Sequence, residues 1–230
     1  MNRVAILGGG PAGYVGAIRA RQLGAEVTLV EMDALGGTCL NRGCVPSKVF
    51  LRCAEAARMA RQLDQFGVEA EFKAINWPQV IRRKTQVVGQ LVKGVEYLMK
   101  QNGIKVVRGK GRLAEPHVIA VETEGKEETV TADRVVLATG SVPARLPLPG
   151  LDLPGVLTSD EMLDIDHIPQ SLAIIGGGVI GVEFAEVFSA MGSKVTIIEM
   201  LPRIIPLEDE EMSAELARAF RRRKIDVFAD

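Results

Sequence analysis

The feature that most constrains the fold of this chain is an internal repeat, displaced by 168 residues. The nine residues AILGGGPAG that begin at Ala5 recur as AIIGGGVIG from Ala173, and the match runs without a gap to Glu31 and Glu199. In each copy an aliphatic run precedes three glycines, a stretch with helical spacing and a second apolar run. Each copy therefore predicts a strand–turn–helix–strand unit. The fold class expected is α/β, with two Rossmann-like doubly wound modules of which the second is incomplete.

The repeat also predicts the bounds of these elements. The first strand, the helix and the second strand are expected at 3–7, 11–23 and 26–30 in the first copy, and at 172–175, 179–191 and 194–198 in the second. Gly24 and Gly192 follow the two helices, at a position where glycine commonly ends a helix. Between the copies, long helices are expected at 46–65, with Pro46 near its first position, and at 77–102, followed by several strands within 104–138.

A proline-rich stretch is the best candidate for a domain boundary. The apolar run that begins at Val135 ends in Ala-Thr-Gly-Ser, and four prolines follow between residues 143 and 154. Because proline and glycine interrupt regular structure, the boundary is expected near residue 145. The prediction is one nucleotide-binding domain at 1–145 and part of a second at 146–230.

Both glycine turns have the context that a dinucleotide site needs. A strand precedes each G-x-G-x-x-G motif, a helix follows it, and an acidic residue lies 21 positions after the second glycine. The first glycine permits a tight turn, the second lets the backbone approach a pyrophosphate, and the third allows close packing of helix on strand. A carboxylate at the end of the second strand accepts hydrogen bonds from a ribose 2′-hydroxyl and repels a 2′-phosphate, so FAD or NAD is expected and NADP is not.

The nucleotide-contacting residues follow from these two motifs. They are Gly8, Gly10, Pro11, Ala12, Gly13 and Glu31 in the first copy, and Gly176, Gly178, Val179, Ile180, Gly181 and Glu199 in the second. The alternative is a pair of glycine-rich turns that bind nothing. Two complete copies in register argue against that alternative.

Two cysteines follow the first acidic residue within the segment GGTCLNRGCVPSK, which runs from Gly36 to Lys48. A zinc site would need four ligands, and the remaining soft donors have no ligand-like spacing, so no metal is expected. Two buried structural thiols and a redox pair remain as interpretations of Cys39 and Cys44. Five residues of regular helix rise about 7.5 Å, beyond the usual Cα separation of a disulfide. A redox pair therefore requires a distorted segment, and Gly43 supplies the freedom.

This cysteine segment resembles the active-site signature of the pyridine nucleotide-disulfide oxidoreductases, and the similarity covers essentially the whole chain. Within that family the chain most resembles the dihydrolipoyl dehydrogenases in two features. The cysteine segment ends in Pro46-Ser47-Lys48, and no basic residue directly follows Glu199. Mercuric reductases share most of the motif. Arg42 departs from the small apolar residue usual at its position. The resemblance implies a flavoprotein that oxidises dihydrolipoamide with NAD through FAD and a Cys39–Cys44 disulfide.

The resemblance also implies roles for single residues. Cys39 would be the thiol that exchanges with the substrate, and Cys44 would face the flavin. Lys48 would lie near flavin N5, where a cation stabilises the reduced flavin, and Glu183 would be its carboxylate partner near the nicotinamide. Further contacts to FAD, mostly through backbone groups, would come from Gly37, Thr38, Gly111, Thr139, Gly140 and Ser141. The domain at 1–145 would then hold FAD and the disulfide, and 146–230 would begin the NAD domain.

Composition limits the other functional classes. The net charge is −1 without a basic stripe, so neither nucleic acid nor an acidic membrane is an expected partner. No signal peptide precedes the first strand and only three cysteines are present, which favours a cytoplasmic location. Cys53 is expected to be a buried apolar filler. Two alternatives to a disulfide oxidoreductase remain. One is a catalytically silent fragment that binds FAD or NAD, and the other is a flavin-free NAD dehydrogenase.

Members of this family continue for a comparable length beyond the part resembled here. The missing part would complete the NAD domain and add a dimerisation domain that supplies a His–Glu acid/base pair to the partner's site. Neither His117 nor His167 lies in a motif for that role. The parent enzyme is therefore expected to be a homodimer through a region absent here, acting on a lipoyl-bearing small molecule or protein. The chain alone is expected to turn over lipoamide poorly.

Overall fold

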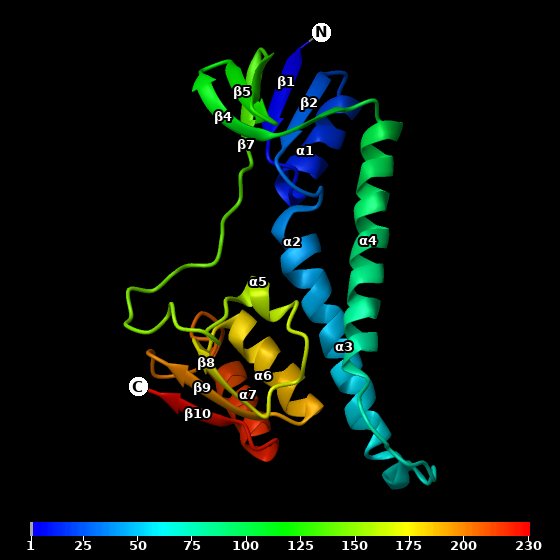
Figure 1. Cartoon of the computed structure of the whole chain (residues 1–230), viewed down its shortest axis with the longest axis vertical. Helices are drawn as coiled ribbons and strands as arrows, with labels where there is room; N and C mark the ends of the chain where they lie inside the picture. The colour runs from blue at the N-terminus through cyan, green and yellow to red at the C-terminus, as the bar shows by residue number, and fades with distance from the viewer. Residues whose placement is uncertain (1) are drawn as a thin grey trace. The chain divides into compact units, whose positions relative to one another are not determined.

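The computed structural model describes residues 2–230, and the chain divides into two compact units. Unit 1 comprises residues up to Pro46 together with Thr85–Asp160, and unit 2 comprises Ser47–Lys84 together with Glu161–Asp230. Two long helices, α3 (Cys44–Ala60) and α4 (Trp77–Gln101), each begin in one unit and end in the other (Figure 1). The division into two packed units therefore differs from a single boundary in the sequence near residue 145. The FAD and NAD domain bounds stay a prediction.

Unit 1 is built on a parallel sheet of four strands in the order β3-β2-β1-β7. The strands are β1 (Arg3–Leu7), β2 (Glu26–Glu31), β3 (Lys105–Arg108) and β7 (Arg134–Leu137). Helix α1 (Pro11–Gln22) connects β1 to β2 and begins at a proline, whose fixed φ suits the first helical position. One face of the sheet packs on α1 and α4 through Ile6, Leu29, Ala17 and Met99, all of which are buried.

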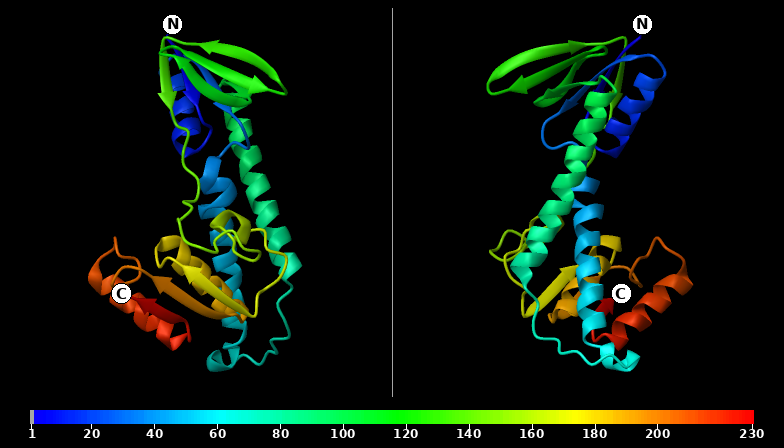
Figure 2. Two further views of the ribbon diagram at one scale, coloured as in Figure 1. Left: turned by 60° about the vertical axis from the view of Figure 1, so that its left-hand side comes forward. Right: turned by 90° about the vertical axis from the view of Figure 1, so that its right-hand side faces the viewer.

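A second, antiparallel sheet covers the other face of the unit 1 sheet. Its strands β4 (Lys110–Glu115), β5 (Val118–Thr123) and β6 (Lys126–Thr131) pair in sequence order. Figure 2 shows it on the side of the parallel strands opposite α1. Ile119 and Val121 of β5 are fully buried against Leu7 and Val30. The two sheets enclose an apolar layer, and burial of that layer stabilises unit 1.

Unit 2 repeats only part of this plan. Its parallel sheet has three strands in the order β10-β9-β8. The elements are β8 (Ser171–Ile175), α6 (Val179–Met191), β9 (Lys194–Glu199), α7 (Glu210–Arg222) and β10 (Asp226–Ala229). The core lies between the sheet and its helices. Trp77 packs between Phe50 and Phe188 there, with ring centroids 5.2 and 5.8 Å away, and its indole N–H donates to the Ile165 carbonyl at 2.9 Å.

The strands and helices expected from both repeats are confirmed to within a residue or two, as are the second long helix and the strands between 104 and 138. The helix expected at 46–65 was wrong at both ends. It begins at Cys44, so that Pro46 is its third residue, where an N–H has no partner within the helix in any case. It ends at Ala60 and is followed by a 3₁₀ turn, η1 (Leu63–Phe66), closed by Gly67 at φ +71°.

Two short helices complete the description, α2 (Gly37–Arg42) and α5 (Ser159–Met162). None of the helices in residues 2–230 combines the length and the apolar character needed to cross a membrane.

Candidate functional site

The first glycine turn joins β1 to α1 and leaves no room for side chains. Gly8 has φ +108°, and its N–H donates to the Val30 carbonyl at 2.8 Å. A Cβ on Gly8 would lie 2.1 Å from the Ala138 carbonyl oxygen, and a Cβ on Gly13 would lie 1.8 Å from the Gly8 oxygen. Both distances are far below van der Waals contact, so the turn has this shape only with glycine at both positions.

A carboxylate lies directly beneath this turn. The two oxygens of Glu31, which is buried, accept hydrogen bonds from the Gly9 N–H at 2.6 Å and from the Asp33 N–H at 2.8 Å. Each carboxylate oxygen has a second lone pair, so two backbone donors do not exhaust its capacity. The residue expected to accept a ribose hydroxyl is therefore held in one orientation by the turn itself.

The cysteine segment begins against the same turn. Gly37, the first residue of α2, has φ +58°, and a Cβ there would lie 2.5 Å from the Cα of Gly10. Cys39 lies in the first turn of α2. The helix that carries this thiol is therefore packed, backbone on backbone, on the middle of the glycine motif.

Gly43 separates the two cysteines into two helices. α2 ends at Arg42 and α3 begins at Cys44, so the distortion predicted between the thiols is present. A Cβ on Gly43 would lie 3.1 Å from the Thr38 oxygen and 3.4 Å from the Cα of Cys39, which shows how closely the chain doubles back. Cys39 is partly exposed and Cys44 is exposed.

The second glycine turn repeats the first one closely. The Glu199 carboxylate accepts from the Gly177 N–H at 2.6 Å and from the Leu201 N–H at 2.8 Å. A Cβ on Gly181 would lie 2.0 Å from the Gly176 oxygen, the counterpart of the contact at Gly13. The two copies therefore share both the clamp on the carboxylate and the close packing of helix on turn.

The helices after both turns begin without a side-chain cap from residues 2–230. Their N-caps are Gly10 and Gly178. The first two residues of each helix are exposed: Pro11 and Ala12 in α1, and Val179 and Ile180 in α6. By contrast, α7 is capped by Asp209, whose carboxylate accepts from the Glu211 N–H at 2.8 Å. The N–H groups in the first turns of α1 and α6 thus remain available to an anion, which the helix dipole also favours.

Unit 2 also holds the lysine and the glutamate that the resemblance singles out. Lys48 lies on α3, and its Nζ is 2.5 Å from Oε1 of Glu183 on α6. The pair is partly exposed, so its net contribution to stability is small, about 0–1 kcal/mol.

Comparison with known proteins identifies the family of this chain. Residues 2–229 match the family described as pyridine nucleotide-disulphide oxidoreductase. The chain belongs to this family. It is similar to a dihydrolipoyl dehydrogenase of Bacillus subtilis (strain 168), with 47% identity over 233 residues, which covers 96% of this chain and 49% of that protein. It is also similar to the dihydrolipoyl dehydrogenase of Acholeplasma laidlawii, with 41% identity over 97% of this chain and 67% of the relative.

A solved structure gives the same assignment for the fold. The HOCl-induced flavoprotein disulfide reductase RclA from Escherichia coli superposes with a TM-score of 0.84 and 29% identity, over 99% of this chain and 48% of that one. The Rossmann-like α/β fold expected for a pyridine nucleotide-disulphide oxidoreductase is confirmed. The chain spans about half the length of the Bacillus subtilis relatives it matches.

The remaining residues expected to contact a cofactor in this family lie in two places. One place is the segment after β7, which holds Thr139, Gly140 and Ser141. Because β7 pairs with β1, this segment starts beside the first glycine turn. Gly111 lies on β4, where a Cβ would be 2.3 Å from Leu7 and 3.0 Å from Val30. A side chain at position 111 would therefore require Leu7 to shift in the packing between the two sheets of unit 1.

Reasoning from sequence missed two polar contacts beside the cysteines. The Asn41 side-chain amide donates to the carbonyls of Leu35 and Gly37, at 3.1 and 3.0 Å, and so holds α2 against the loop before it. Arg42 forms an ion pair with Asp33, two residues after the clamped carboxylate. The short polar side chain of Asn41, four residues after a glycine, is the one signal that could have indicated such a contact.

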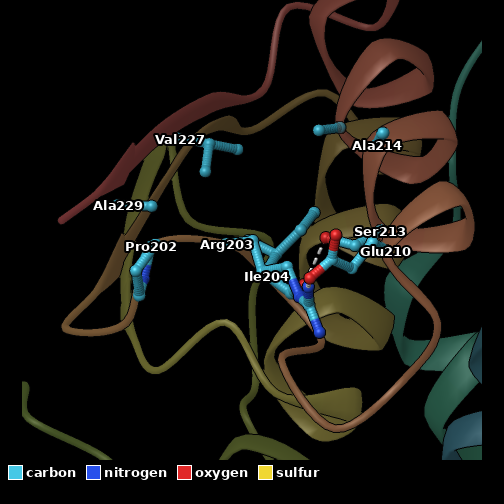
Figure 3. A pocket seen from close by; sticks show the side chains of 9 residues that line it. Pro202, Arg203, Ile204, Glu210, Ser213, Ala214, Val227 and Ala229 are labelled. Carbon is cyan, nitrogen blue, oxygen red and sulfur yellow. Dashed lines mark hydrogen bonds and ion pairs between the residues drawn. The ribbon is translucent and has the colours of Figure 1, made fainter.

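A cavity of about 210 Å³, also missed, lies beside the loop that follows Glu199 (Figure 3). It is lined by Pro202, Arg203, Ile204, Glu210, Ser213, Ala214, Ala217, Val227 and Ala229. An ion pair between Arg203 and Glu210, 2.6 Å long, ties the loop to α7, and the Ser213 hydroxyl donates to the Ile204 carbonyl at 2.7 Å. The lining comes from the loop after Glu199, from α7 and from β10, and these residues form no motif that could have marked the cavity in the sequence.

Cys53, the third cysteine, differs from the pair. Burial raises the pKa of its thiol, and Arg83 opposes this shift in part. A raised pKa leaves less thiolate, the reactive form of cysteine. Its partial burial against the unit 2 core agrees with the expected apolar filler.

Proposed function

We propose that this chain is part of a flavoprotein enzyme that oxidises dihydrolipoamide with NAD. The reaction would pass through a redox-active pair formed by Cys39 and Cys44. The observation that carries the proposal is the backbone contact of Gly37 on Gly10, because it joins the thiol-bearing helix to a nucleotide turn with a clamped carboxylate. The relatives are named for this activity, and they match the chain over almost its whole length.

The residues of unit 1 fit FAD. Gly8, Gly10 and Gly13 provide the close backbone, the uncapped N-terminus of α1 suits a pyrophosphate, and Glu31 suits a ribose. Further backbone contacts come from Gly37, Thr38, Gly111 and the segment Thr139–Ser141. When bound, FAD would accept the two electrons of the dithiol and deliver them to NAD.

The second turn fits NAD by the same reasoning. Gly176, Gly178 and Gly181 form the turn, Val179 and Ile180 begin the uncapped helix, and Glu199 is the ribose acceptor. The apolar cavity after Glu199 is available to the base of the nucleotide. Lys48 would place a positive charge near the flavin, and Glu183 would hold that charge in position.

The thiol chemistry belongs to the two cysteines. One substrate thiolate attacks Sγ of Cys39 in the Cys39–Cys44 disulfide, the S–S bond breaks, and Cys44 leaves with the electron pair as a thiolate. The second substrate thiolate then attacks the substrate sulfur of the mixed disulfide, and Cys39 leaves as a thiolate. The substrate ends as a cyclic disulfide, its two protons pass to base or solvent, and its two electrons reside on the cysteine pair.

The wider biology is part of the same proposal. The substrate would be a lipoyl group on a small molecule or on a protein, the complete enzyme would be a homodimer, and the location would be the cytoplasm. Residues 1–145 would form the FAD domain and 146–230 the first part of the NAD domain.

An absorption spectrum of the purified chain with added FAD, titrated anaerobically with dithionite, tests the proposal. A long-wavelength band at two-electron reduction is expected, from the Cys44 thiolate against oxidised flavin. Cys44→Ser should abolish the band, whereas Cys53→Ser, the matched control, should leave it intact. A flavin spectrum that is the same in all three proteins, or a chain that binds no FAD, would mean a catalytically silent fragment.

Turnover assays with the complete enzyme separate the candidate substrates. Reduction of NAD by dihydrolipoamide, without reduction of mercuric ion, is the expected pattern. The reverse pattern would place the protein with the mercuric reductases and leave the FAD site and the cysteine pair unchanged.

A further inference from the structure

A carboxylate on α6 bridges two other helices of unit 2. Only 18% of the Glu186 side chain is exposed. Its Oε1 forms an ion pair with Nη1 of Arg58 on α3 at 2.5 Å, and its Oε2 accepts a hydrogen bond from Arg223, the residue that caps the end of α7. One carboxylate therefore joins α3, α6 and α7, and we call these three residues the Glu186 bridge.

The bridge lies one helical turn after Glu183. Glu183 and Glu186 are three residues apart on α6, so they are neighbours on one face of the helix, about 4.5 Å apart along its axis. Both face α3, where Glu183 pairs with Lys48 at 2.5 Å and Glu186 pairs with Arg58 at the same distance. A movement of α6 on α3 at the bridge is therefore passed on to the contact between Glu183 and Lys48.

The contacts between α3 and α6 differ in how well water can screen them. The Lys48 side chain is 61% exposed, whereas that of Arg58 is 27% exposed. An exposed ion pair contributes little to holding two helices together, and hydrogen bonds between charged groups are stronger where water is kept away. Beyond the bridge, Arg61 donates a partly buried hydrogen bond to the Ala190 carbonyl at 2.6 Å. The shielded contacts thus lie on the C-terminal side of Glu183.

We infer that Glu186 is a positioning residue, which holds α6 on α3 and so sets where Glu183 meets Lys48. The aromatic packing of Phe188 on Trp77 also joins α6 to this part of unit 2. Apolar burial has no preferred direction, however, whereas the hydrogen bonds of a carboxylate with two guanidinium groups fix the position of the helix along its partner. In the proposed function, on which this last step rests, the position of Lys48 determines the charge beside the flavin.

Two variants of opposite charge separate positioning from a simple effect of charge. Glu186→Gln removes a negative charge, and Arg58→Gln removes a positive one. If these groups acted on the Lys48 ammonium only through space, the first variant would destabilise the ammonium and the second would stabilise it. If the bridge positions α6, both variants loosen the contact between Glu183 and Lys48, and both destabilise the ammonium.

The test is trace acetylation of the 230-residue chain with acetic anhydride, without any cofactor, followed by mass spectrometry of each lysine. An amine reacts only in its unprotonated form, and a carboxylate partner stabilises the protonated form. Glu183→Gln removes that partner and should speed the labelling of Lys48 about two- to fivefold, which is what an exposed ion pair is worth. Glu186→Gln and Arg58→Gln should both speed it by about half of that increase or more, and Arg58→Lys, which keeps the cation, should stay near the native rate.

A control variant and a control lysine accompany these measurements. Glu55 forms an ion pair with Arg52 at 2.5 Å, and both lie on α3. Glu55→Gln therefore also removes a carboxylate and leaves an arginine without it, but cannot move α6, and should leave the labelling of Lys48 unchanged. Lys84 is buried and donates to the Leu163 carbonyl at 3.0 Å, so its slow labelling reports that unit 2 stays folded in every variant.

The FAD-bound protein shows what the position of Lys48 does. The midpoint potential of the flavin should fall in Glu186→Gln, in the same direction as in Lys48→Gln and by a smaller amount, because a misplaced cation stabilises the reduced flavin less. An unchanged potential in both variants would contradict the proposed role of Lys48. The acetylation rates, measured without FAD, decide the inference about Glu186 separately.

Three outcomes would overturn the inference. The first is an unchanged labelling rate of Lys48 in Glu186→Gln, which would mean that apolar packing alone positions α6. The second is a faster rate in Glu186→Gln with a slower one in Arg58→Gln, which would reduce the bridge to an effect of charge. The third is faster labelling of Lys84 together with Lys48, which would make the bridge a general support of unit 2.

Discussion

The two halves of the internal repeat share their turns but not their surroundings. In both, backbone N–H groups clamp the glutamate and the third glycine packs on the oxygen of the first. In unit 1 a second sheet buries Leu7, whereas its counterpart Ile175 in unit 2 is half exposed. Local sequence therefore determines the shape of the turn, and segments distant in sequence determine how well the same strand is buried.

The largest difference is expected between Gly8→Ala and Gly176→Ala. Both glycines have φ near +105°, so either alanine is strained by about 1–3 kcal/mol. Only the alanine at 8 also overlaps the Ala138 carbonyl, and it should destabilise unit 1 by more than about 4 kcal/mol. Urea unfolding with hydrogen exchange, assigned to each unit, measures both. Equal losses would mean that the edge strand does not distinguish the copies.

The next largest difference compares Leu7→Ala with Ile175→Ala. Removing a buried leucine side chain costs about 2–5 kcal/mol, while removal of a half-exposed one should cost about 1 kcal/mol or less. The same unfolding measurement applies.

The local parts of the structure were predictable from sequence. The glycine turns, both repeated strand–helix–strand units and the distortion at Gly43 follow from residue types at fixed spacing. The roles assigned to the site residues stay predictions. Two backbone donors to Glu31 were not expected, but the 21-residue interval after Gly10 did indicate a carboxylate near the turn.

The non-local parts were not predictable. Residues 47–84 belong to unit 2 because Trp77 packs its ring between those of Phe50 and Phe188, and Phe188 lies more than a hundred residues later. No spacing within either segment indicates such a contact. Likewise, the sequence predicts strands between 104 and 138 but does not indicate which face of the parallel sheet they cover. Gly111 was therefore interpreted only as a cofactor contact, and its packing against Leu7 was not foreseen.

A smaller effect is expected at α7, which has a side-chain cap, whereas α1 and α6 have none from residues 2–230. Asp209→Ala removes the acceptor for the Glu211 N–H and should cost about 1 kcal/mol, whereas Asp209→Asn should retain most of the cap. Thermal unfolding of the two variants measures this. A loss with asparagine as large as that with alanine would point to the charge of Asp209 rather than to the hydrogen bond.

The smallest effect concerns an ion pair that unit 1 has at its sheet edge. Arg3 donates a hydrogen bond to Asp133 from its side chain and another from its backbone, and these lower the pKa of Asp133 to about 2. The folded state therefore favours the carboxylate. The small stability this provides is fully present above the ordinary carboxyl pKa of 3.8 and is lost as the pH falls through about 2.

Carbon NMR of the Asp133 carboxyl group, followed against pH, checks this value directly. Asp133→Asn should remove that part of the acid dependence and leave stability at neutral pH nearly unchanged, because the pair is exposed. A midpoint at the ordinary carboxyl value would show that the hydrogen bonds do not persist in solution.

The clamped carboxylates have a consequence for how a nucleotide is recognised. A free glutamate side chain samples many rotamers, and immobilising it on binding costs about 0.5–1.5 kcal/mol. At Glu31 and Glu199 folding has already selected one rotamer, since the backbone of the turn holds both oxygens. Both sites are thus preorganised, and a hydroxyl donor that arrives there meets an acceptor whose orientational entropy was lost when the chain folded.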